Sequence, residues 1–415
     1  MSRQLRICVV TPGPLGSNPR VVKEAGALQE NGHQVTVIST RTQDFVDQRD
    51  NAVLANAAWS SFRLDFRSRG NAWRLRRAVQ IGYGLGFSIT GYVGIADRAL
   101  SPFTGPLVAA AKRVPADLYI AHYPAALPAA AIAASLHGAR YAFDAEDFHL
   151  GDFPDARIYE PQRRLINTIE GRYLPGCVYV TAASPGIADA YVGAYQIPRP
   201  TVVLNVFPRA QAPAGPTVSG TQVWGPSVYW FSQTIGAGRG LECAVQAIGR
   251  ARVRPHLYLR GTPVSGYPDR LRVMADEAGA PDRVHLLPLA APSEMERLAA
   301  SYDVGFSGEP GHTRSNRAAL ANKLFTYLLA GLPVVMSDTP AHQALAAQFG
   351  QAARLYTTDD PNSLASALDF LLGDPQRLAA VRAAAFRLGQ TRFNWEVEVR
   401  WLMSAIEPLS GDCRN

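Results

Sequence analysis

The strongest constraint on this chain is a repeated order of strand, glycine-containing loop, helix and strand. Residues 5–10 (LRICVV) form an apolar run that ends in a Pro/Gly loop, residues 11–19. Residues 21–31 then carry apolar side chains at helical spacing and stop at an Asn-Gly pair. Residues 34–39 (QVTVIS) are typical of a strand. A helix between two such strands is the unit of a parallel sheet, so the sequence predicts an α/β fold.

The same order recurs along the chain in two sets. The first set adds strands at residues 117–122, 140–144, 178–182 and 202–206, with a helix at 125–136. The second set has strands at 227–232, 256–260, 284–287, 303–306 and 333–336, with helices at 241–251, 316–330 and 361–372. Two such sets predict two Rossmann-like parallel-sheet domains with an interdomain cleft, where ligands bind at the carboxyl ends of the strands.

The boundary between the two sets is rich in Pro, Gly, Ala and Ser and has no apolar period. We expect an N-terminal domain at residues 1–207, a linker at 208–222 and a C-terminal domain at 223–390. The last segment, residues 391–415, contains an apolar helical face across 393–409. We expect that helix to return to the first domain.

The charge balance is only mildly basic: 41 Lys and Arg against 34 Asp and Glu give +7. This is far from the dense basic face of a nucleic-acid binder, so we expect no nucleic acid as partner. Lysine occurs only at positions 23, 112 and 323. The 4 cysteines have no metal-ligand spacing, and the N-terminus has no apolar signal region. We expect reduced thiols, a cytoplasmic location and no metal or cofactor.

Residues 71–96 interrupt the α/β alternation. A basic stretch from Asn71 to Arg77 contains Trp73, and the 19 residues 78–96 carry no charge. Three interpretations stay open: a buried or interface helix, an element of a membrane surface or lipid-acceptor groove, and a membrane span, which its five glycines disfavour. A helix with Trp and Arg at one end suits an anionic membrane surface, so residues 73–77 could make the protein peripheral on the inner face of the membrane.

Polar residues follow three predicted strands of the first set. Gly16, Ser17 and Asn18 precede a helix, where backbone N–H groups could meet a phosphate or an acceptor hydroxyl, or could simply form a tight turn. Asp144, Glu146 and Asp147 end one strand and suit sugar hydroxyls or general-base work, with helix capping as the alternative. His122 ends the neighbouring strand, where it could face the same cleft or serve only the fold.

The second set contains a stronger loop. Gly236, Gly238 and Gly240 let the backbone approach a ligand, and Arg239 with the following helix offers positive potential for a diphosphate. A dinucleotide site is the obvious alternative, but it calls for an acidic residue at the end of the next strand. That strand ends instead in Arg260, Gly261 and Thr262.

A third loop and helix follow in the second set. Glu309 lies after a strand, and Lys323 and Thr326 share a face of the helix that contains Asn322. Taken by itself, Lys323 is as well explained as a solvated side chain on an amphipathic helix.

These motifs, in this order, resemble GT-B glycosyltransferases of the family-four type over nearly the whole chain. The likeness is carried by NKLFTYLLAGLPVV at residues 322–335, the first strand-helix-strand unit, the strand ending at His122, Asn205 and the loop at 231–242. The resemblance implies a hexosyltransferase-type enzyme that moves a sugar from a nucleotide diphosphate donor, usually with retention and without a metal. Bacterial members with this variant pattern often accompany cell-surface polysaccharide assembly.

The resemblance also implies roles for single residues. Arg239 and Lys323 would neutralise the diphosphate, Gly261 and Thr262 would line the base pocket, and His122 would lie near the transferred sugar. Acceptor contacts would come from Ser17, Asn18, Arg20 and residues 144–147, and the acceptor would be a glycan, a lipid-linked sugar or a small molecule.

Two positions depart from the family pattern. Thr326 stands where a glutamate commonly holds the donor ribose, with Ala318 eight residues earlier, and Glu309 could supply a carboxylate instead. The first domain has Asp144-Ala-Glu-Asp147 in place of Asp-x-His-Glu. A non-catalytic sugar-nucleotide binder and an NAD(P)-dependent oxidoreductase therefore stay as alternative functions.

Overall fold

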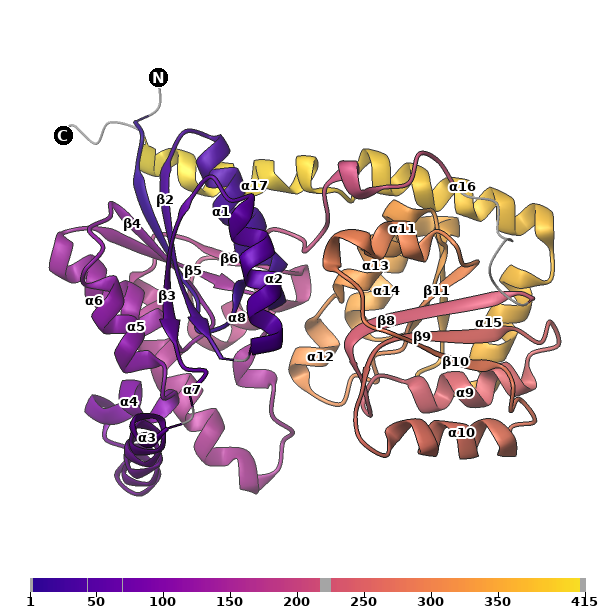
Figure 1. The fold of residues 1–415 in the computed structure, drawn as a ribbon, viewed down its shortest axis with the longest axis horizontal. Coiled ribbons are helices and arrows are strands. Elements are labelled where there is room, and N and C mark those ends of the chain that lie inside the picture. Colours follow the sequence, from indigo (N-terminus) through magenta and orange to yellow (C-terminus); the bar gives the residue numbers. More distant parts are fainter. Residues whose placement is uncertain (1–2, 43, 69, 217–224, 411–415) are drawn as a thin grey trace. The chain divides into compact units, whose positions relative to one another are not determined.

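The chain forms two compact units (Figure 1). The computed structural model describes residues 3–42, 44–68, 70–216 and 225–410. The first unit contains the chain up to Val203, a short stretch at Thr313–Ser315 and the chain from Val399 onward. The second contains Leu204–His312 and Asn316–Glu398. Residues 217–222 of the expected linker and Cys413 lie outside the described residues.

The first unit is built on a parallel sheet that has seven strands in the described part of the chain, in the order β3-β2-β1-β4-β5-β6-β7. Its helices are α1 (Pro19–Glu30), α2 (Asp44–Ala55), α3 (Asn71–Thr90), α4 (Ala96–Leu100), α5 (Thr104–Ala111), α6 (Leu127–His137), α7 (Glu160–Tyr173) and α8 (Pro185–Tyr195). Its strands are β1 (Arg6–Val10), β2 (Gln34–Arg41), β3 (Ser60–Asp65), β4 (Leu118–His122), β5 (Arg140–Ala145), β6 (Val180–Ala182) and β7 (Thr201–Val202).

The second unit repeats this plan with six described parallel strands, in the order β10-β9-β8-β11-β12-β13. Its helices are α9 (Leu241–Arg250), α10 (Tyr267–Glu277), α11 (Met295–Ala299), α13 (Asn322–Ala330), α14 (Pro340–Phe349), α15 (Pro361–Leu372) and α16 (Pro375–Thr391). Its strands are β8 (Ser227–Ile235), β9 (His256–Pro263), β10 (Val284–Leu287), β11 (Val304–Ser307), β12 (Val334–Ser337) and β13 (Ala353–Tyr356). Helices α12 (Arg314–Ala318) and α17 (Trp395–Ser410) each contain residues of both units.

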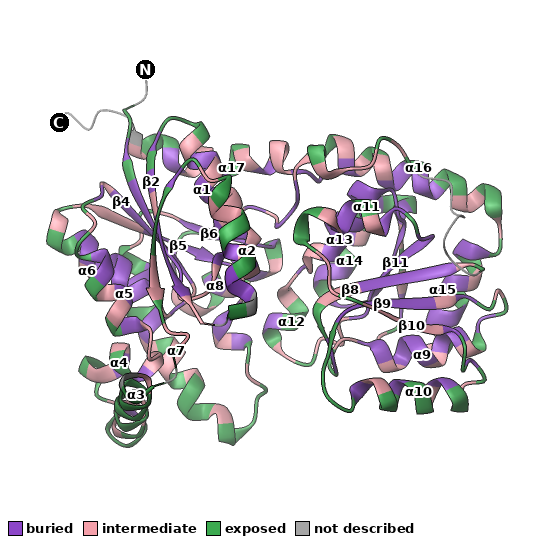
Figure 2. Ribbon diagram, viewed as in Figure 1, coloured by how far each residue is buried: buried purple, intermediate pink, exposed green. Residues whose placement is uncertain are grey.

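Inner strands β4 and β12 are buried along their whole length, and Figure 2 shows the buried strands of both sheets. β4 and β12 expose no residue, because helices of a parallel sheet cover both of its faces and its inner strands become continuous apolar runs. The expected α/β class, with two Rossmann-like parallel sheets, is therefore confirmed. The end of α17 belongs to the first unit, where Arg140 of β5 donates to the carbonyl of Leu409.

Each sheet places its site at a switch in strand order. β1 lies between β2 and β4, and β8 lies between β9 and β11, so the loops that follow these strands diverge. Ligands of open parallel sheets bind at such points, outside the carboxyl ends of the strands.

The structure corrects several sequence-based elements. β3 and β13 were not expected, because both lie at the edge of a sheet and neither has a fully buried run. The helix expected at 316–330 is two helices: α12 ends at Ala318, and Ala321 takes an extended backbone before α13 begins. Leu320 is buried between the two helices, so apolar side chains keep their helical spacing across the break. The sequence pattern therefore gives no sign of the break. The strand expected at 202–206 shrinks to the two residues of β7.

Helix α3 differs most from its expected burial. It covers Asn71–Thr90, and most of its residues are exposed (Figure 2). Large apolar side chains on it and just after it are open to solvent: Leu75, Val79, Ile81, Leu85, Ile89, Tyr92 and Val93. Among the described residues, none of the helices has both the length and the apolar character needed to cross a bilayer. The segment is therefore neither a buried helix nor a span.

Candidate functional site

Buried charged side chains gather at the carboxyl edge of the first sheet. The guanidinium of Arg20, in the first turn of α1, donates to both carboxylate oxygens of Asp144 at 2.6 Å and to the carbonyl of Val203 at 2.6 Å. Their side chains are 6% and 3% exposed. Thr181 of β6 also donates to Asp144. Such a pair, satisfied on every side, fixes α1 against the ends of β5 and β6.

His122, the last residue of β4, joins this group and is fully buried. Its Nε2 lies 2.5 Å from Glu24 Oε2, and its Nδ1 lies 3.1 Å from Glu146 Oε1 and 3.3 Å from Asp144 Oδ2. Burial alone would lower the pKa of the imidazole, but the charges of Glu24 and Asp144 raise it well above the ordinary 6.5. The carboxylates at both ring nitrogens therefore favour the positively charged form of His122.

Glu146 connects this buried group to more accessible side chains. Its carboxylate accepts from the amide of Asn18 at 2.8 Å and from the hydroxyl of Tyr123 at 3.2 Å, and it is 13% exposed. The oxygen of the same Asn18 side chain caps α1 by accepting from the amides of Arg20 and Val21. Asn18 thus links the start of α1 to the loop after β5.

The structure brings together most of the residues expected on the acceptor side. Asn18, Arg20, His122, Asp144 and Glu146 form one network. Asp147 is half-buried beside it, and burial raises the pKa of its carboxyl. Both nitrogens of His122 and the whole guanidinium of Arg20 are engaged within the protein, so these two side chains position their neighbours.

Gly16 has a different environment from the one expected. Its amide donates to Asp50 at 2.6 Å, and a Cβ there would lie 2.5 Å from Arg49 Cβ. The amide of Gly16 is thus used inside the protein, because the loop packs closely on α2. Ser17 is half-buried, and its hydroxyl donates to the carbonyl of Pro14 at 3.0 Å.

The same network contains a set of metal-ligand atoms. One atom each from His122, Asp144 and Glu146 lies within 4.8 Å of the others. Arg20 occupies both oxygens of Asp144, so a cation there would compete with a buried ion pair. The absence of a metal stays a prediction from the sequence.

In the second unit, the glycine-containing loop after β8 packs tightly. Gly238 and Gly240 have left-handed backbones, with φ of +76° and +71°. A Cβ at Gly240 would lie 2.1 Å from the carbonyl oxygen of Gly308, in the loop after β11. Gly240 immediately precedes the ten-residue helix α9, whose N-terminal amides favour an anion. Arg239 is half-buried in this turn.

Glu309, next to Gly308, forms a close ion pair with Lys323 of α13. Lys323 Nζ lies 2.5 Å from Glu309 Oε1, and the two side chains are 7% and 20% exposed. Burial would raise the pKa of Glu309, but the ammonium of Lys323, the neighbouring His342 and the hydrogen bond from Ser307 lower it to about 2. The packing of Gly240 on Gly308 therefore connects the glycine loop to the buried lysine.

Sequence reasoning missed the side chains around this ion pair. Ser307 donates to Glu309 Oε2 at 2.5 Å, and Ser337 donates to the Glu309 carbonyl at 2.7 Å. His342 Nε2 lies 4.0 Å from Glu309 Oε2, and the ring of Trp230 lies 5.6 Å from Lys323 Nζ. Ser307 and Ser337 each end a strand, and that position was the signal that could have revealed them.

Two other expected donor contacts are placed differently. Thr326 is fully buried, and its hydroxyl donates to Glu296 of α11 at 2.9 Å. Arg260 is buried and donates to the hydroxyl of Tyr229 and to the carbonyl of Pro288, both at 2.8 Å. Both side chains make contacts inside the domain, and their part in donor binding stays a prediction.

The remaining expected donor residues differ in their access. Gly236 is buried, and Gly261 has φ of +153° with Ser232 so close that a Cβ would lie 2.6 Å from its carbonyl oxygen. Thr262 is exposed at the end of β9, and Asn322 is half-buried at the first position of α13. Thr262 and Asn322 can therefore still reach a ligand.

The family match covers most of the first unit. Residues 16–206 match the family described as the glycosyl transferase 4-like domain. This chain has the GT-B fold, and its residues 16–206 are similar to the glycosyl transferase 4-like domain. No curated protein matches its sequence. The expected resemblance to family-four GT-B proteins is thus confirmed.

Solved structures share the fold of this GT-B protein across nearly its full length. HepE of Anabaena, in complex with UDP and glucose, has 15% identity and a TM-score of 0.72, covering 98% of this chain and 100% of HepE. Sucrose-phosphate synthase of Thermosynechococcus elongatus has 15% identity and a TM-score of 0.69, covering 98% and 99%. WaaG, a glycosyltransferase involved in lipopolysaccharide biosynthesis, has 13% identity and a TM-score of 0.60, covering 96% and 98%.

Proposed function

We propose that this GT-B protein transfers a sugar from a nucleotide diphosphate donor to an acceptor hydroxyl. The observation that carries the proposal is the close packing of the glycine turn, which contains Arg239, on Gly308, next to the ion pair of Glu309 and Lys323. It combines backbone amides at a helix N-terminus with two cationic side chains, which suits a diphosphate. HepE, which has the same fold, was solved with UDP and with UDP-glucose.

The proposed chemistry needs stabilisation of a leaving group. The bond between the anomeric carbon and the diphosphate oxygen breaks, and its electrons stay on the diphosphate. Arg239, Lys323 and the N-terminus of α9 stabilise this added charge, and no metal is part of the proposal. The acceptor oxygen bonds to the anomeric carbon, and its proton passes to the departing diphosphate oxygen. We propose retention at that carbon, as the family resemblance implies.

The Glu309 carboxylate has a place in this scheme. It holds Lys323 at 2.5 Å before a donor binds, so the ammonium is ordered at the site and the charge of the buried lysine is balanced. A bound diphosphate adds further negative charge for the same ammonium. We propose that Thr262 and Asn322 contribute polar contacts to the donor.

The acceptor contacts are proposed for the carboxyl edge of the first sheet. Asn18, Glu146 and Asp147 carry polar groups that suit sugar hydroxyls, and Ser17 lies in the same loop as Asn18. These groups are held in place by the buried contacts among Arg20, Asp144 and His122. The acceptor is a glycan, a lipid-linked sugar or a small molecule of a cell-surface polysaccharide pathway.

We propose that α3 brings the protein to the inner face of an anionic membrane. Leu85 and Ile89 are 61% and 83% exposed, and Arg74 and Arg77 stand at the other end of the helix. Such a helix suits the interface of an anionic bilayer. Trp73 is half-buried and packs with Phe66 and Phe103 at centroid distances of 6.1 and 5.6 Å.

A thermal-shift screen tests the donor class. The full chain is heated with UDP-, GDP- and dTDP-sugars and, separately, with NAD and NADP. We expect stabilisation by a nucleotide sugar, because a ligand of the folded state raises the unfolding midpoint. Stabilisation by NAD or NADP alone would support the oxidoreductase alternative and reject the proposal.

A non-catalytic nucleotide-sugar binder is the second candidate. The burial of Thr326 against Glu296 favours it, since the position where the family commonly has a ribose-binding glutamate presents no side chain to a ligand. Release of nucleoside diphosphate from a stabilising donor distinguishes the two. Binding in calorimetry without any release would identify the non-catalytic protein.

A further inference from the structure

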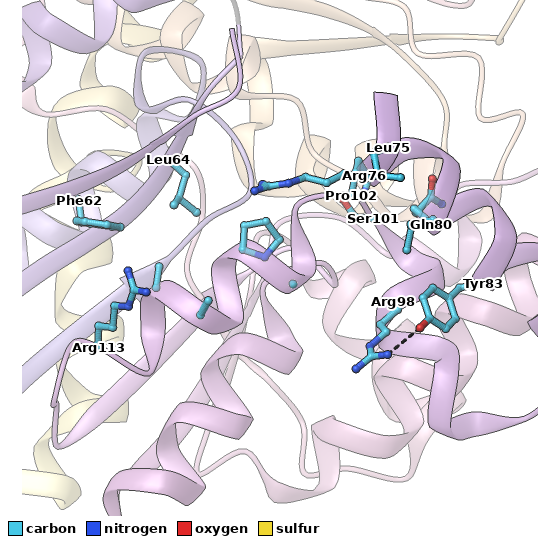
Figure 3. A pocket seen from close by; sticks show the side chains of 15 residues that line it. Phe62, Leu64, Leu75, Arg76, Gln80, Tyr83, Arg98, Ser101, Pro102 and Arg113 are labelled. Atoms are coloured by element: carbon cyan, nitrogen blue, oxygen red, sulfur yellow. Dashed lines mark hydrogen bonds between the residues drawn. The ribbon is translucent and has the colours of Figure 1, made fainter. Parts of the chain in front are cut away.

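An open, apolar pocket lies in the first unit, apart from the charged network at the sheet edge. Its volume is about 590 Å³, and β3, α3, α4 and α5 contribute its lining (Figure 3). Phe62 and Leu64 of β3, Leu75 and Val79 of α3, and Ala109 of α5 supply much of the wall. This volume falls in the range of roughly 300–1,000 Å³ typical of small-molecule sites.

Three arginines stand around this apolar wall. Arg76 comes from α3, Arg98 from α4 and Arg113 from just beyond α5, and Figure 3 shows Arg76 and Arg113 on opposite sides of the pocket. Arg98 donates to the hydroxyl of Tyr83 at 2.7 Å. Arg76 lies over the ring of Phe66 at 5.5 Å and Arg98 over the ring of Tyr83 at 5.4 Å. No acidic residue lines the pocket, and none of the ion pairs of the described residues includes these three arginines. The pocket is thus apolar inside with unbalanced positive charge around it.

This combination of surfaces narrows the class of ligand. Arginine recognises phosphate through several planar N–H donors, whereas the apolar wall gains free energy only by covering hydrocarbon. A free phosphate ion leaves the apolar wall bare, and a neutral hydrocarbon leaves the three cations unpaired. An amphiphile with a phosphate group and an alkyl or prenyl chain satisfies both.

The pocket lies beside α3, and this position indicates where such an amphiphile would come from. Leu75 and Val79 line the pocket and are also 66% and 48% exposed, so the wall is continuous with the exposed apolar residues of α3. A helix that lies on a bilayer presents its neighbouring groove to lipid chains.

We propose that this pocket holds the hydrocarbon chain of a phosphate-bearing membrane lipid, with its phosphate on one of the arginines that line the pocket (Arg76, Arg98 and Arg113). The site goes beyond the sugar transfer proposed above, because no nucleotide or sugar enters the argument. It rests on the proposed membrane contact of α3 for the source of the lipid, but not for binding itself.

Calorimetry with a soluble single-chain probe tests the site without a membrane. Decyl phosphate, below its micelle concentration, is titrated into the full chain, and we expect one saturable site. Ala109→Trp places a large side chain at the pocket wall, so we expect at least a tenfold weaker Kd. Ala380→Trp is the matched control on an exposed helical position of α16, and its Kd is expected within twofold of wild type.

Two further probes separate the contributions of chain and charge. Decyl maltoside has the same chain with a neutral head, and inorganic phosphate has the charge without a chain. We expect both to bind at least tenfold more weakly than decyl phosphate. Arg76→Gln/Arg98→Gln/Arg113→Gln is expected to remove the preference for decyl phosphate over decyl maltoside. The exposed triple variant Arg250→Gln/Arg252→Gln/Arg272→Gln, with the same loss of charge, is expected to keep it.

Specific results would overturn the inference. Binding of decyl phosphate that Ala109→Trp leaves unchanged would place the probe elsewhere, and no saturable binding at all would reject the site. Inorganic phosphate binding as tightly as decyl phosphate would reject the role of the chain. Since no donor and no bilayer is present, failure here is independent of failure in sugar transfer or in membrane binding.

Discussion

Gly240 shows how a single residue shapes the donor side of this protein. Its backbone has φ of +71°, and the carbonyl oxygen of Gly308 occupies the space where a Cβ would be. Gly238, two residues earlier, has φ of +76° but no neighbour within 4 Å of its Cβ position. A comparison of substitutions at the two glycines therefore distinguishes the effect of backbone strain from the effect of a steric clash.

Gly240→Ala is expected to disturb the contact between the glycine turn and the loop that holds Glu309. Gly238→Ala, the matched control, adds only left-handed strain of about 1–2 kcal/mol. We expect Gly240→Ala to weaken binding of a stabilising nucleotide sugar at least tenfold, measured by calorimetry, with Gly238→Ala much closer to wild type. Equal effects of the two substitutions would contradict the close packing of Gly240 on Gly308.

His122 makes the stability of the first unit depend on pH. Its pKa is raised in the folded protein, so the folded state holds the proton more tightly than the unfolded chain, whose pKa is about 6.5. The stabilisation is complete below pH 6.5 and is lost as the pH rises through the folded pKa. We expect the thermal unfolding midpoint of the wild type to fall as the pH rises from 6 to 9. We expect this fall to be smaller in His122→Asn.

Circular dichroism melts of wild type and His122→Asn at matched pH values check this. His149 is also buried with a raised pKa, so the difference between the two proteins, not the wild-type curve alone, is the quantity to compare. Parallel curves for the two proteins would contradict a charged His122.

At the scale of elements, α3 stands out because its apolar side chains face solvent. Sequence reasoning recognised the segment as unusual, but it placed the membrane contact on Trp73 and the arginines. The structure instead packs Trp73 against Phe66 and Phe103 and leaves Leu85 and Ile89 open. The sequence pattern of a tryptophan near arginines could not tell a membrane-facing tryptophan from a packed one, because the packing partners lie in other segments of the chain.

Leu85→Gln/Ile89→Gln is expected to reduce pelleting of the protein with anionic liposomes at least tenfold. Each side chain, if buried in a bilayer interface, contributes up to about 1.5–3 kcal/mol. Leu136→Gln/Ile158→Gln is the matched control, since those residues are 59% and 75% exposed on other elements. Pelleting that is equal in both variants and in wild type would reject the membrane contact of α3.

For the whole molecule, the alternation of strands and helices was enough to predict two parallel α/β sheets. The inner strands are continuous runs of apolar residues, so these runs were enough to predict their positions. Edge strands such as β3 have no continuous apolar run. The polar residues at strand ends were also predictable, because all parallel strands end at one edge. Their partners were not: the pairing of Lys323 with Glu309, or of Thr326 with Glu296, depends on side chains 14 and 30 residues apart.

The measurement that tests the central claim most directly is donor turnover by Lys323 variants of the full chain. Release of nucleoside diphosphate is followed with the UDP-, GDP- and dTDP-sugars, for wild type, Lys323→Met and the exposed-lysine control Lys112→Met. Because Lys323→Met leaves Glu309 without its cation, Glu309→Gln/Lys323→Met is included to recover folding stability. We predict turnover in wild type and Lys112→Met, with a loss of at least a hundredfold in both proteins that lack Lys323. Turnover at the wild-type rate by a folded Lys323→Met protein would contradict the account.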